Sequence, residues 1–210
     1  MRPVTVSVGP LAAASATNIA ASQTPTSAFT LVNNPVTLDT ARRVLVTTTG
    51  NESAKTITIV GTDRGGLPQT EVITGPNATT GYTNLDFLTV SSITISSAAA
   101  NTITVGTNGI ASSAWVRFDD WASAQVGAQC TVIGTVNYTV QQTMQDPNNP
   151  TNPVTPYAAN FVVSGDSNAV AATGNIQTFF PYAPAYAKVT LNSGTGSVTA
   201  TFTQYGVNPI

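Results

Sequence analysis

Apolar and polar residues alternate along most of the chain with a period of two, which is the period of a β-strand. The clearest run covers residues 56–60, where Ile57 and Ile59 fall on one face and threonines fall on the other. The turn residues 62–66 and a second run over residues 69–74 follow, so we expect an antiparallel hairpin. No helical period extends beyond a turn or two. The pattern therefore predicts an all-β protein.

Similar runs predict strands elsewhere, separated by turns that are rich in Gly, Asn and Pro. Turns at intervals of about 8–12 residues are typical of an antiparallel β-sandwich or a jelly roll. We expect one long strand at residues 130–143 and a final hairpin at residues 186–204, whereas the proline-rich residues 145–153 form a loop. The other expected strands cover residues 4–8, 44–48, 87–95, 101–105 and 161–163.

This pattern divides the chain into an extended N-terminal arm with the first strands, residues 1–35, and two β-sandwich domains, residues 36–112 and 113–210. One sandwich with a long insertion stays an alternative to two domains. Residues 11–27 are small and uncharged, and three interpretations of them stay open. They form a loop, a mobile arm, or an extended strand that adds to a neighbouring protein.

Charged residues make up only 8% of the chain, against roughly 25% in ordinary soluble domains. The polar surface must therefore be built from Thr, Ser, Asn and Gln, and such a surface suits packing against other proteins. The formal net charge is −2. Because a nucleic-acid partner calls for a basic patch, we expect none.

The residue types that carry most enzyme chemistry are nearly absent. The chain has no histidine and one cysteine, Cys130, which lies in an alternating run and is expected to be a small buried strand residue. The nine acidic residues are scattered, whereas a glycosidase needs two carboxylates that face each other across a sugar. We therefore predict no enzyme activity, no catalytic residue, no cofactor and no metal, and a depolymerase stays only as a third hypothesis.

Each of two acidic segments has two interpretations, a ligand-binding site and a simple turn or loop. Asp119 and Asp120, next to Trp121, have the groups to bind a cation or a sugar, but neighbours on a strand point to opposite sides. Residues 146–152 offer oxygen ligands of the kind that calcium takes, but their prolines break the spacing of a calcium loop. A solvated turn and a plain loop are the favoured interpretations.

Two further segments invite a comparison with phosphate or nucleic-acid binding. Residues 61–66 resemble a phosphate-binding loop, yet they lack the Lys-Ser/Thr end and precede a strand, so we expect a turn. Arg42 and Arg43 are too few for a nucleic-acid patch. We expect one of them to face solvent or to pair with Asp39 or Glu52.

Aromatic residues gather at residues 179–186 and around the two tryptophans. Aromatic side chains are enriched where interfaces concentrate their binding energy, so these residues are the best candidates for a contact surface. The alternative is that they close the end of the second sandwich. The predicted interface residues are Phe179, Phe180, Tyr182, Tyr186, Trp115 and Trp121.

From Arg43 onward the chain resembles a family of small virion proteins of tailed bacteriophages. The resemblance is carried by threonine-rich runs and Gly-Thr-Asp turns, at residues 43–47, 50–53, 57–66, 69–76, 88–95, 103–107, 187–191 and 196–200. It implies a structural role on the phage particle and leaves the place on the particle open.

We therefore expect a head decoration, or cement, protein that binds the outside of the capsid lattice and stabilises it. Its partners would be the major capsid protein and copies of itself, as a trimer or dimer, and the arm would order on a neighbour. The alternative is a neck, tail or fibre-attachment protein, with residues 179–186 as a docking or glycan surface. No segment reaches the about 18 apolar residues of a membrane helix. Residues 1–6 lack the apolar stretch of a signal peptide. We expect synthesis in the host cytoplasm, followed by localisation at the capsid surface of the virion.

Overall fold

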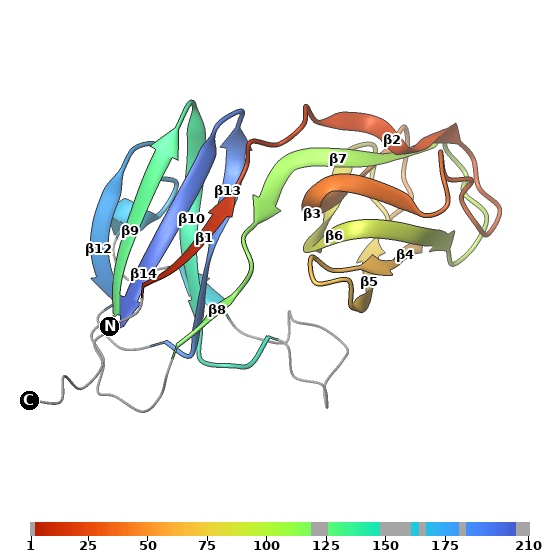
Figure 1. Cartoon of the computed structure of the whole chain (residues 1–210). Coiled ribbons are helices and arrows are strands. Elements are labelled where there is room, and N and C mark those ends of the chain that lie inside the picture. Colours follow the sequence, from red (N-terminus) through yellow and green to blue (C-terminus); the bar gives the residue numbers. More distant parts are fainter. Residues whose placement is uncertain (1–2, 119–125, 148–160, 164–166, 181–183, 205–210) are drawn as a thin grey trace, which may run out of the picture. The chain divides into compact units, whose positions relative to one another are not determined.

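The computed structural model of the chain describes residues 3–118, 126–147, 161–163, 167–180 and 184–204. These residues form almost only antiparallel strands, which confirms the all-β prediction (Figure 1). The chain divides into two compact units. The terminal unit contains the described residues up to Ala12 and from Ile110 onward. The inserted unit contains residues 13–109, which lie between these two parts of the terminal unit along the chain.

The expected arm at residues 1–35 is divided between the two units. Strand β1 (Val4–Val8) belongs to the terminal unit, and strand β2 (Ser15–Gln23) belongs to the inserted unit, where it pairs with β7 (Ile103–Ser112). Ile19 and Ala20 of β2 are fully buried. The hypothesis that residues 11–27 order on a neighbouring protein is therefore wrong. Ile19 and Ala20 of this segment are buried within their own chain.

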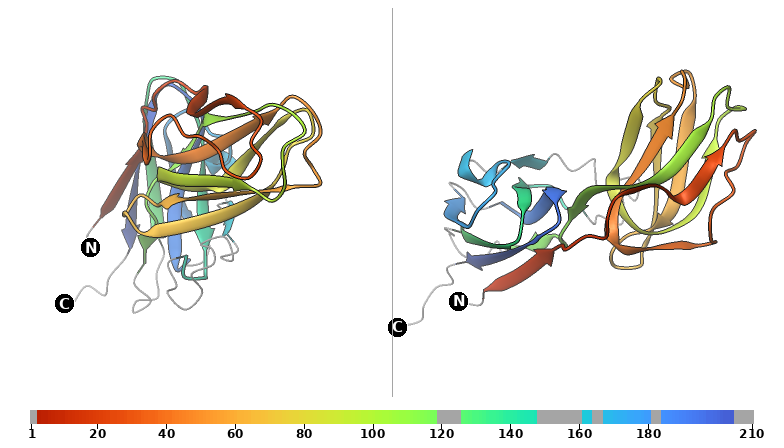
Figure 2. Two further views of the ribbon diagram at one scale, coloured as in Figure 1. Left: turned by 90° about the vertical axis from the view of Figure 1, so that its right-hand side faces the viewer. Right: turned by 90° about the horizontal axis from the view of Figure 1, so that it is seen from above.

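The terminal unit is a sandwich of two antiparallel sheets. The first sheet has the order β1-β14-β9-β12. In the second sheet, one edge of β13 pairs with β8 and with residues 111–112 at the end of β7, and the other edge pairs with β10, followed by β11. Figure 2 shows β1 beside β14, although they come from opposite ends of the described chain. The bounds are β8 Val116–Arg117, β9 Val126–Ile133, β10 Val136–Thr143, β11 Phe161–Val163, β12 Ile176–Phe180, β13 Tyr186–Gly194 and β14 Ser197–Gln204.

The pairing in this unit is nested from the outside inward. The first strand pairs with the last, β1 with β14, and then β8 pairs with β13, β9 with β12, and β10 with β11. All of these pairs are antiparallel. The terminal unit is therefore one long hairpin of four strand pairs, wrapped so that its two faces meet in a common core.

The nested pairing corrects two sequence-based predictions. Residues 130–143 are two strands and not one, because the chain turns at Gly134, whose φ of 78° is open to glycine at little strain. Residues 186–204 are two strands but not a paired hairpin. Strand β13 pairs with β10, whereas β14 pairs with β1 and β9. Both turns carry the chain from one sheet to the other, and local alternation contains no signal for that.

Aromatic side chains fill one end of the terminal core. The rings of Phe118, Phe180 and Phe202 lie with their centroids 5.7 to 6.2 Å apart. Cys130 is buried in β9, which confirms its interpretation as a strand residue, and burial raises the pKa of its thiol to about 11. Tyr138 is also buried and its hydroxyl donates to the carbonyl of Gly174 at 2.8 Å.

The inserted unit is built on strands in the order β7-β3-β6-β4-β5, with β2 on β7. The expected hairpin is confirmed, because β4 pairs with β5 from Thr56 opposite Thr74 to Thr62 opposite Pro68. Ile57 and Ile59 are fully buried, as their alternation predicted. The longest strands, β3 and β6, change register along their pairing, and such bulges bend a sheet. The bounds are β3 Val36–Thr48, β4 Thr56–Thr62, β5 Pro68–Thr74 and β6 Thr80–Ile95.

The two ends of the inserted unit lie side by side. Ser15 of β2 pairs with Thr107 of β7. Their backbones approach closely, because a Cβ atom at Gly106 would lie 1.9 Å from the carbonyl oxygen of Ser15. A unit whose ends are adjacent interrupts another fold with little disturbance. The adjacent ends therefore explain how residues 13–109 can be inserted in the sequence between β1 and the later strands of the terminal unit.

Two neighbouring phenylalanines give a matched test of the sandwich. Phe180 is 2% exposed and Phe179 is 63% exposed. We expect Phe180→Ala to lower the free energy of unfolding of the terminal unit by about 3–5 kcal/mol, because it leaves a cavity among three rings. The control Phe179→Ala should change it by only about 0.5 kcal/mol. Urea denaturation followed by tryptophan fluorescence measures both, and equal losses in the two variants would contradict the packing.

Candidate interaction surface

Most charged side chains of the inserted unit are used inside it. Arg42 is 1% exposed, and its guanidinium donates to Asp39 Oδ1 at 3.0 Å and to the carbonyl of Asn108. The expectation that one arginine pairs with Asp39 is thus confirmed for Arg42. Arg43 Nε lies 3.8 Å from Asp86 Oδ1, and its guanidinium lies over the ring of Tyr82. These groups hold the unit together and leave little charge for a ligand.

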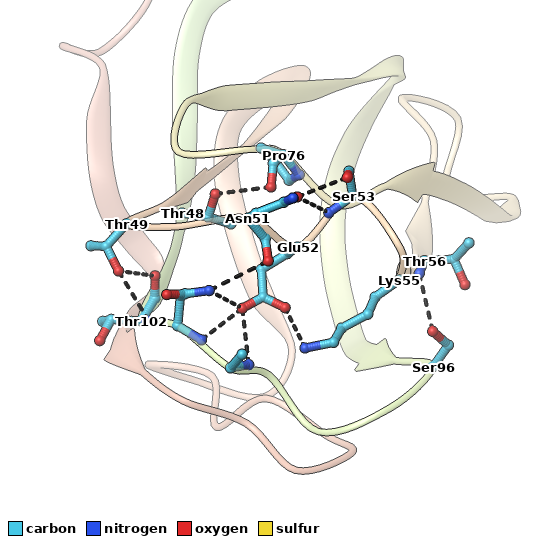
Figure 3. A network of polar contacts seen from close by, with 12 residues as sticks. Thr48, Thr49, Asn51, Glu52, Ser53, Lys55, Thr56, Pro76, Ser96 and Thr102 are labelled. Atoms are coloured by element: carbon cyan, nitrogen blue, oxygen red, sulfur yellow. Dashed lines mark hydrogen bonds and ion pairs between the residues drawn. The ribbon is translucent and has the colours of Figure 1, made fainter.

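Glu52 is the centre of a buried polar network (Figure 3). Its Oε1 atom accepts hydrogen bonds from the backbone amides of Ala100 and Asn101, at 2.9 and 2.6 Å, and from the Asn101 side chain at 2.9 Å. Its Oε2 atom accepts from Lys55 Nζ. The carboxylate therefore ties the connection between β3 and β4 to the connection between β6 and β7.

The pKa of Glu52 is shifted by two opposing causes. Burial, the largest single effect, raises the pKa, but the hydrogen bonds from Lys55 and Asn101 together outweigh it, so that the pKa lies below its ordinary value of 4.5. The group is a carboxylate at neutral pH, and it accepts hydrogen bonds from Lys55, Ala100 and Asn101. Its hydrogen bonds hold two loops together.

Glu71 satisfies the backbone of β6 where that strand changes register against β3. Its two oxygens accept from the amides of Asn84 and Leu85, at 2.9 and 3.1 Å. The hydroxyl of Thr83 accepts from the amide of Val44 and donates to the carbonyl of Leu85. Side chains here replace the ladder bonds that the bulge removes, so this second buried carboxylate is also structural.

The described residues contain no group of three or more His, Cys, Asp or Glu side chains placed to hold a metal ion. The segment at residues 61–66 ends strand β4 and forms the hairpin turn that follows it, so the expected turn is present. Asp63 Oδ1 accepts from the amide of Leu67 at 2.8 Å, and Gly66 has a φ of 81°. Asp119, Asp120 and residues 148–152 lie outside the described residues. In the part of the chain that the structure describes, no helix is long and apolar enough to cross a membrane.

The first sheet of the terminal unit carries an uncharged outer face. Strands β1, β14, β9 and β12 contain no Asp, Glu, Lys or Arg. Their inward residues, such as Val198, Ala200 and Phe202, are buried in the core. Their outward residues form rows across the sheet, of which one is Thr5, Thr201, Gln129 and Gln177, and the next is Ser7, Thr199 and Thr131. We call these seven residues and Phe179 the uncharged face.

The predicted aromatic interface residues separate into different environments. Phe179 is exposed on the uncharged face, where it lies opposite Gly127. Phe180 and Tyr186 are buried, at 2% and 9% exposure, so their rings serve the fold of the chain itself. Trp115 is partly buried, with Lys188 Nζ 4.7 Å from the centre of its ring. Tyr182 and Trp121 lie outside the described residues.

The low total charge is visible in the sequence, but the uncharged face is not. Thr131 and Thr201 are 70 positions apart in the sequence, but they lie on neighbouring strands, since Thr201 pairs with Gln129 and Thr199 pairs with Thr131. The four runs of the first sheet are separate in the sequence, and the pairing of β1 with β14, of β14 with β9 and of β9 with β12 joins them into one surface. No family model matches the chain, and no curated protein or solved structure matches it.

The Glu52 network makes the stability of the inserted unit depend on pH. Because the folded pKa lies below 4.5, the stability that the carboxylate contributes is complete above that pH and is lost as the pH falls through the folded pKa. We expect Glu52→Gln to lower the free energy of unfolding by about 2 kcal/mol at pH 7, because the variant removes the negative charge and the acceptor oxygen that bind Lys55.

The measurement is thermal unfolding of both proteins from neutral pH to about pH 3, a range chosen to pass below the ordinary carboxyl pKa. The gap between wild type and Glu52→Gln should narrow as the pH falls. Asp63→Asn, in the hairpin turn, is the control and should retain most of its stability at pH 7. A difference in stability between wild type and Glu52→Gln that stays constant with pH would contradict the role of Glu52 as a bound carboxylate.

Proposed function

We propose that this chain is a non-enzymatic structural protein of a tailed-bacteriophage virion, and that it decorates the head by binding the outside of the capsid lattice. The uncharged face carries the proposal. The buried carboxylates are occupied in holding the fold, whereas a whole sheet face offers Thr, Ser and Gln side chains to the outside.

An uncharged sheet face suits a protein partner for a physical reason. Charged residues are depleted at the centres of protein interfaces, because removing a charge from water is costly. Hydroxyl and amide groups are cheaper to cover and can hydrogen-bond to the partner or to trapped water. A face with Thr131, Thr201 and Gln129 at its centre can therefore lie against a capsid subunit with no charge to desolvate.

The nested pairing of the terminal unit supports the same conclusion. We infer that this unit is a jelly roll, since its eight paired strands lie in two sheets with the first strand beside the last. Jelly rolls occur in viral capsid proteins and in lectins. The resemblance of the threonine-rich runs to small virion proteins points to the first of these two classes.

The proposed mechanism is thermodynamic. A protein that binds the mature capsid shell, and not the form that precedes it, stabilises the mature shell by mass action. The major capsid protein and further copies of this chain are the partners, and no reaction is required. The arm at residues 11–27 has no part in the mechanism, because β2 pairs within the inserted unit.

The first test is the copy number of the protein in purified virions. We expect hundreds of copies, in a whole-number ratio to the major capsid protein, because decoration follows the capsid lattice. Quantitative mass spectrometry of virions, scaled to the capsid protein, gives this ratio. A handful of copies would instead place the protein at the neck, the tail or a fibre attachment. Absence from virions would contradict a structural role on the particle.

The second test introduces charge on the uncharged face. Gln129 and Thr131 are both exposed on β9. We expect Gln129→Lys with Thr131→Lys to weaken binding to undecorated heads by at least about tenfold, because two charges must then be desolvated. The control is Thr173→Lys, at an exposed position of the same unit and off this sheet. Cosedimentation with heads measures binding, and unchanged binding of the double variant would contradict the assigned face.

A further inference from the structure

Strand β1 forms an edge of the first sheet of the terminal unit. The sheet order ends at β1, so Val4–Val8 pair with β14 along one side, and no described residue pairs with the other side. Natural edge strands are blunted by charged side chains, by proline or by bulges, because bare edges attract other strands. Strand β1 has no charge and no proline, and its five pairs with β14 run in continuous register.

We propose that β1 pairs antiparallel with β1 of a second copy of this chain, about a twofold axis at Val6. The sequence of the strand, Val-Thr-Val-Ser-Val, has the same order of residue classes in both directions. In this register Val6 lies opposite itself, Val4 lies opposite Val8 of the second copy, and Thr5 lies opposite Ser7 of the second copy. Each valine meets a valine and each hydroxyl meets a hydroxyl.

The exposure of the strand supports this register. Val4 is 43% exposed, whereas Val8 is 2% exposed. Pairing would place Val4 beside Val8 of the second copy on the apolar side of the sheet, and so cover the exposed valine. Thr5 and Ser7 are exposed on the other side, within the uncharged face. The two sheets would join, and the uncharged face would continue from one copy to the next.

A twofold pair is favoured over a head-to-tail contact of β1 with the opposite edge strand, β12. Pairing β1 of each copy with β12 of the next is heterologous, and such contacts give open filaments unless the rotation closes a ring. Pairing β1 with β1 covers this edge in both copies, so the association is closed at a dimer. The self-complementary pattern of Val4–Val8 fits this isologous pair.

This inference specifies how copies of the chain associate, and in that respect it rests on the proposed function. Its test uses the pure full-length protein in solution without capsids. If the protein does not dimerise, the proposed head binding and copy number are still tested by their own experiments. If those experiments fail, the dimer is still tested in solution.

The experiment is sedimentation equilibrium from micromolar to near-millimolar concentrations, with two matched double variants. Thr5→Lys with Ser7→Lys places like charges opposite each other, twice in the dimer, and should weaken dimerisation by about tenfold or more. Thr5→Lys with Ser7→Glu places opposite charges together in the same register and should restore it. Both variants remove the same hydroxyls, including the bond of Thr5 to Thr201, and both positions are exposed.

A cross-link gives a second measurement that does not depend on charge. Directly opposite residues of an antiparallel pair have Cα atoms about 4.5–5.5 Å apart, which a disulfide can span. We expect Val6→Cys to form an intermolecular disulfide under mild oxidation, whereas Val4→Cys, which does not face itself, should not. The wild type is the background control because Cys130 is buried.

A wild type that stays monomeric throughout, or a dimer unaffected by Thr5→Lys with Ser7→Lys, would overturn the proposal. So would cross-linking that is equal at positions 4 and 6, or loss of the dimer in both double variants.

Discussion

Pairing of β1 with β14 closes the terminal unit, and the other pairs of its nested hairpin lie within that closure. Thr5 and Thr201, 196 positions apart, share a hydrogen bond between their hydroxyls. Closing a flexible loop of that length costs roughly 5 kcal/mol of chain entropy. The inserted unit reduces this cost, because Ser15 and Thr107 are paired. Once residues 13–109 have folded, they act as a short link between β1 and the rest of the terminal unit.

The two units differ in how many charged residues their strands and turns contain and in what these residues bind. In the inserted unit, Glu52 and Glu71 bind backbone amides at places where strands are interrupted, and arginines pair with nearby aspartates. In the terminal unit, six of the eight described strands carry no charge, and these include all four strands of the first sheet. A low total charge is thus not a uniform property of this protein. The charged side chains of the inserted unit hold its loops and strands in place. The first sheet of the terminal unit has an uncharged outer face because its strands contain no charged residue.

The strands were largely predictable from the sequence, but their partners were not. Alternation located the β4–β5 hairpin because both strands and their turn are local. It failed at Gly134 and at residues 192–196, where the same local pattern changes sheet. The alternation of β2 was obscured by small residues, so its place on β7 was missed. The uncharged face follows only from pairings between strands that are distant in sequence. The buried role of Glu52 depends likewise on a loop 48 positions away.

The neutrality of the first sheet has a consequence for the ionic environment. Salt screens interactions between exposed charges, with a Debye length of about 8 Å at physiological ionic strength. A surface that has Thr131, Thr199 and Thr201 in place of charged groups offers little for salt to screen. Contacts made through it are governed by shape, hydrogen bonding and buried area. Screening of charges by salt would therefore change the strength of such contacts little.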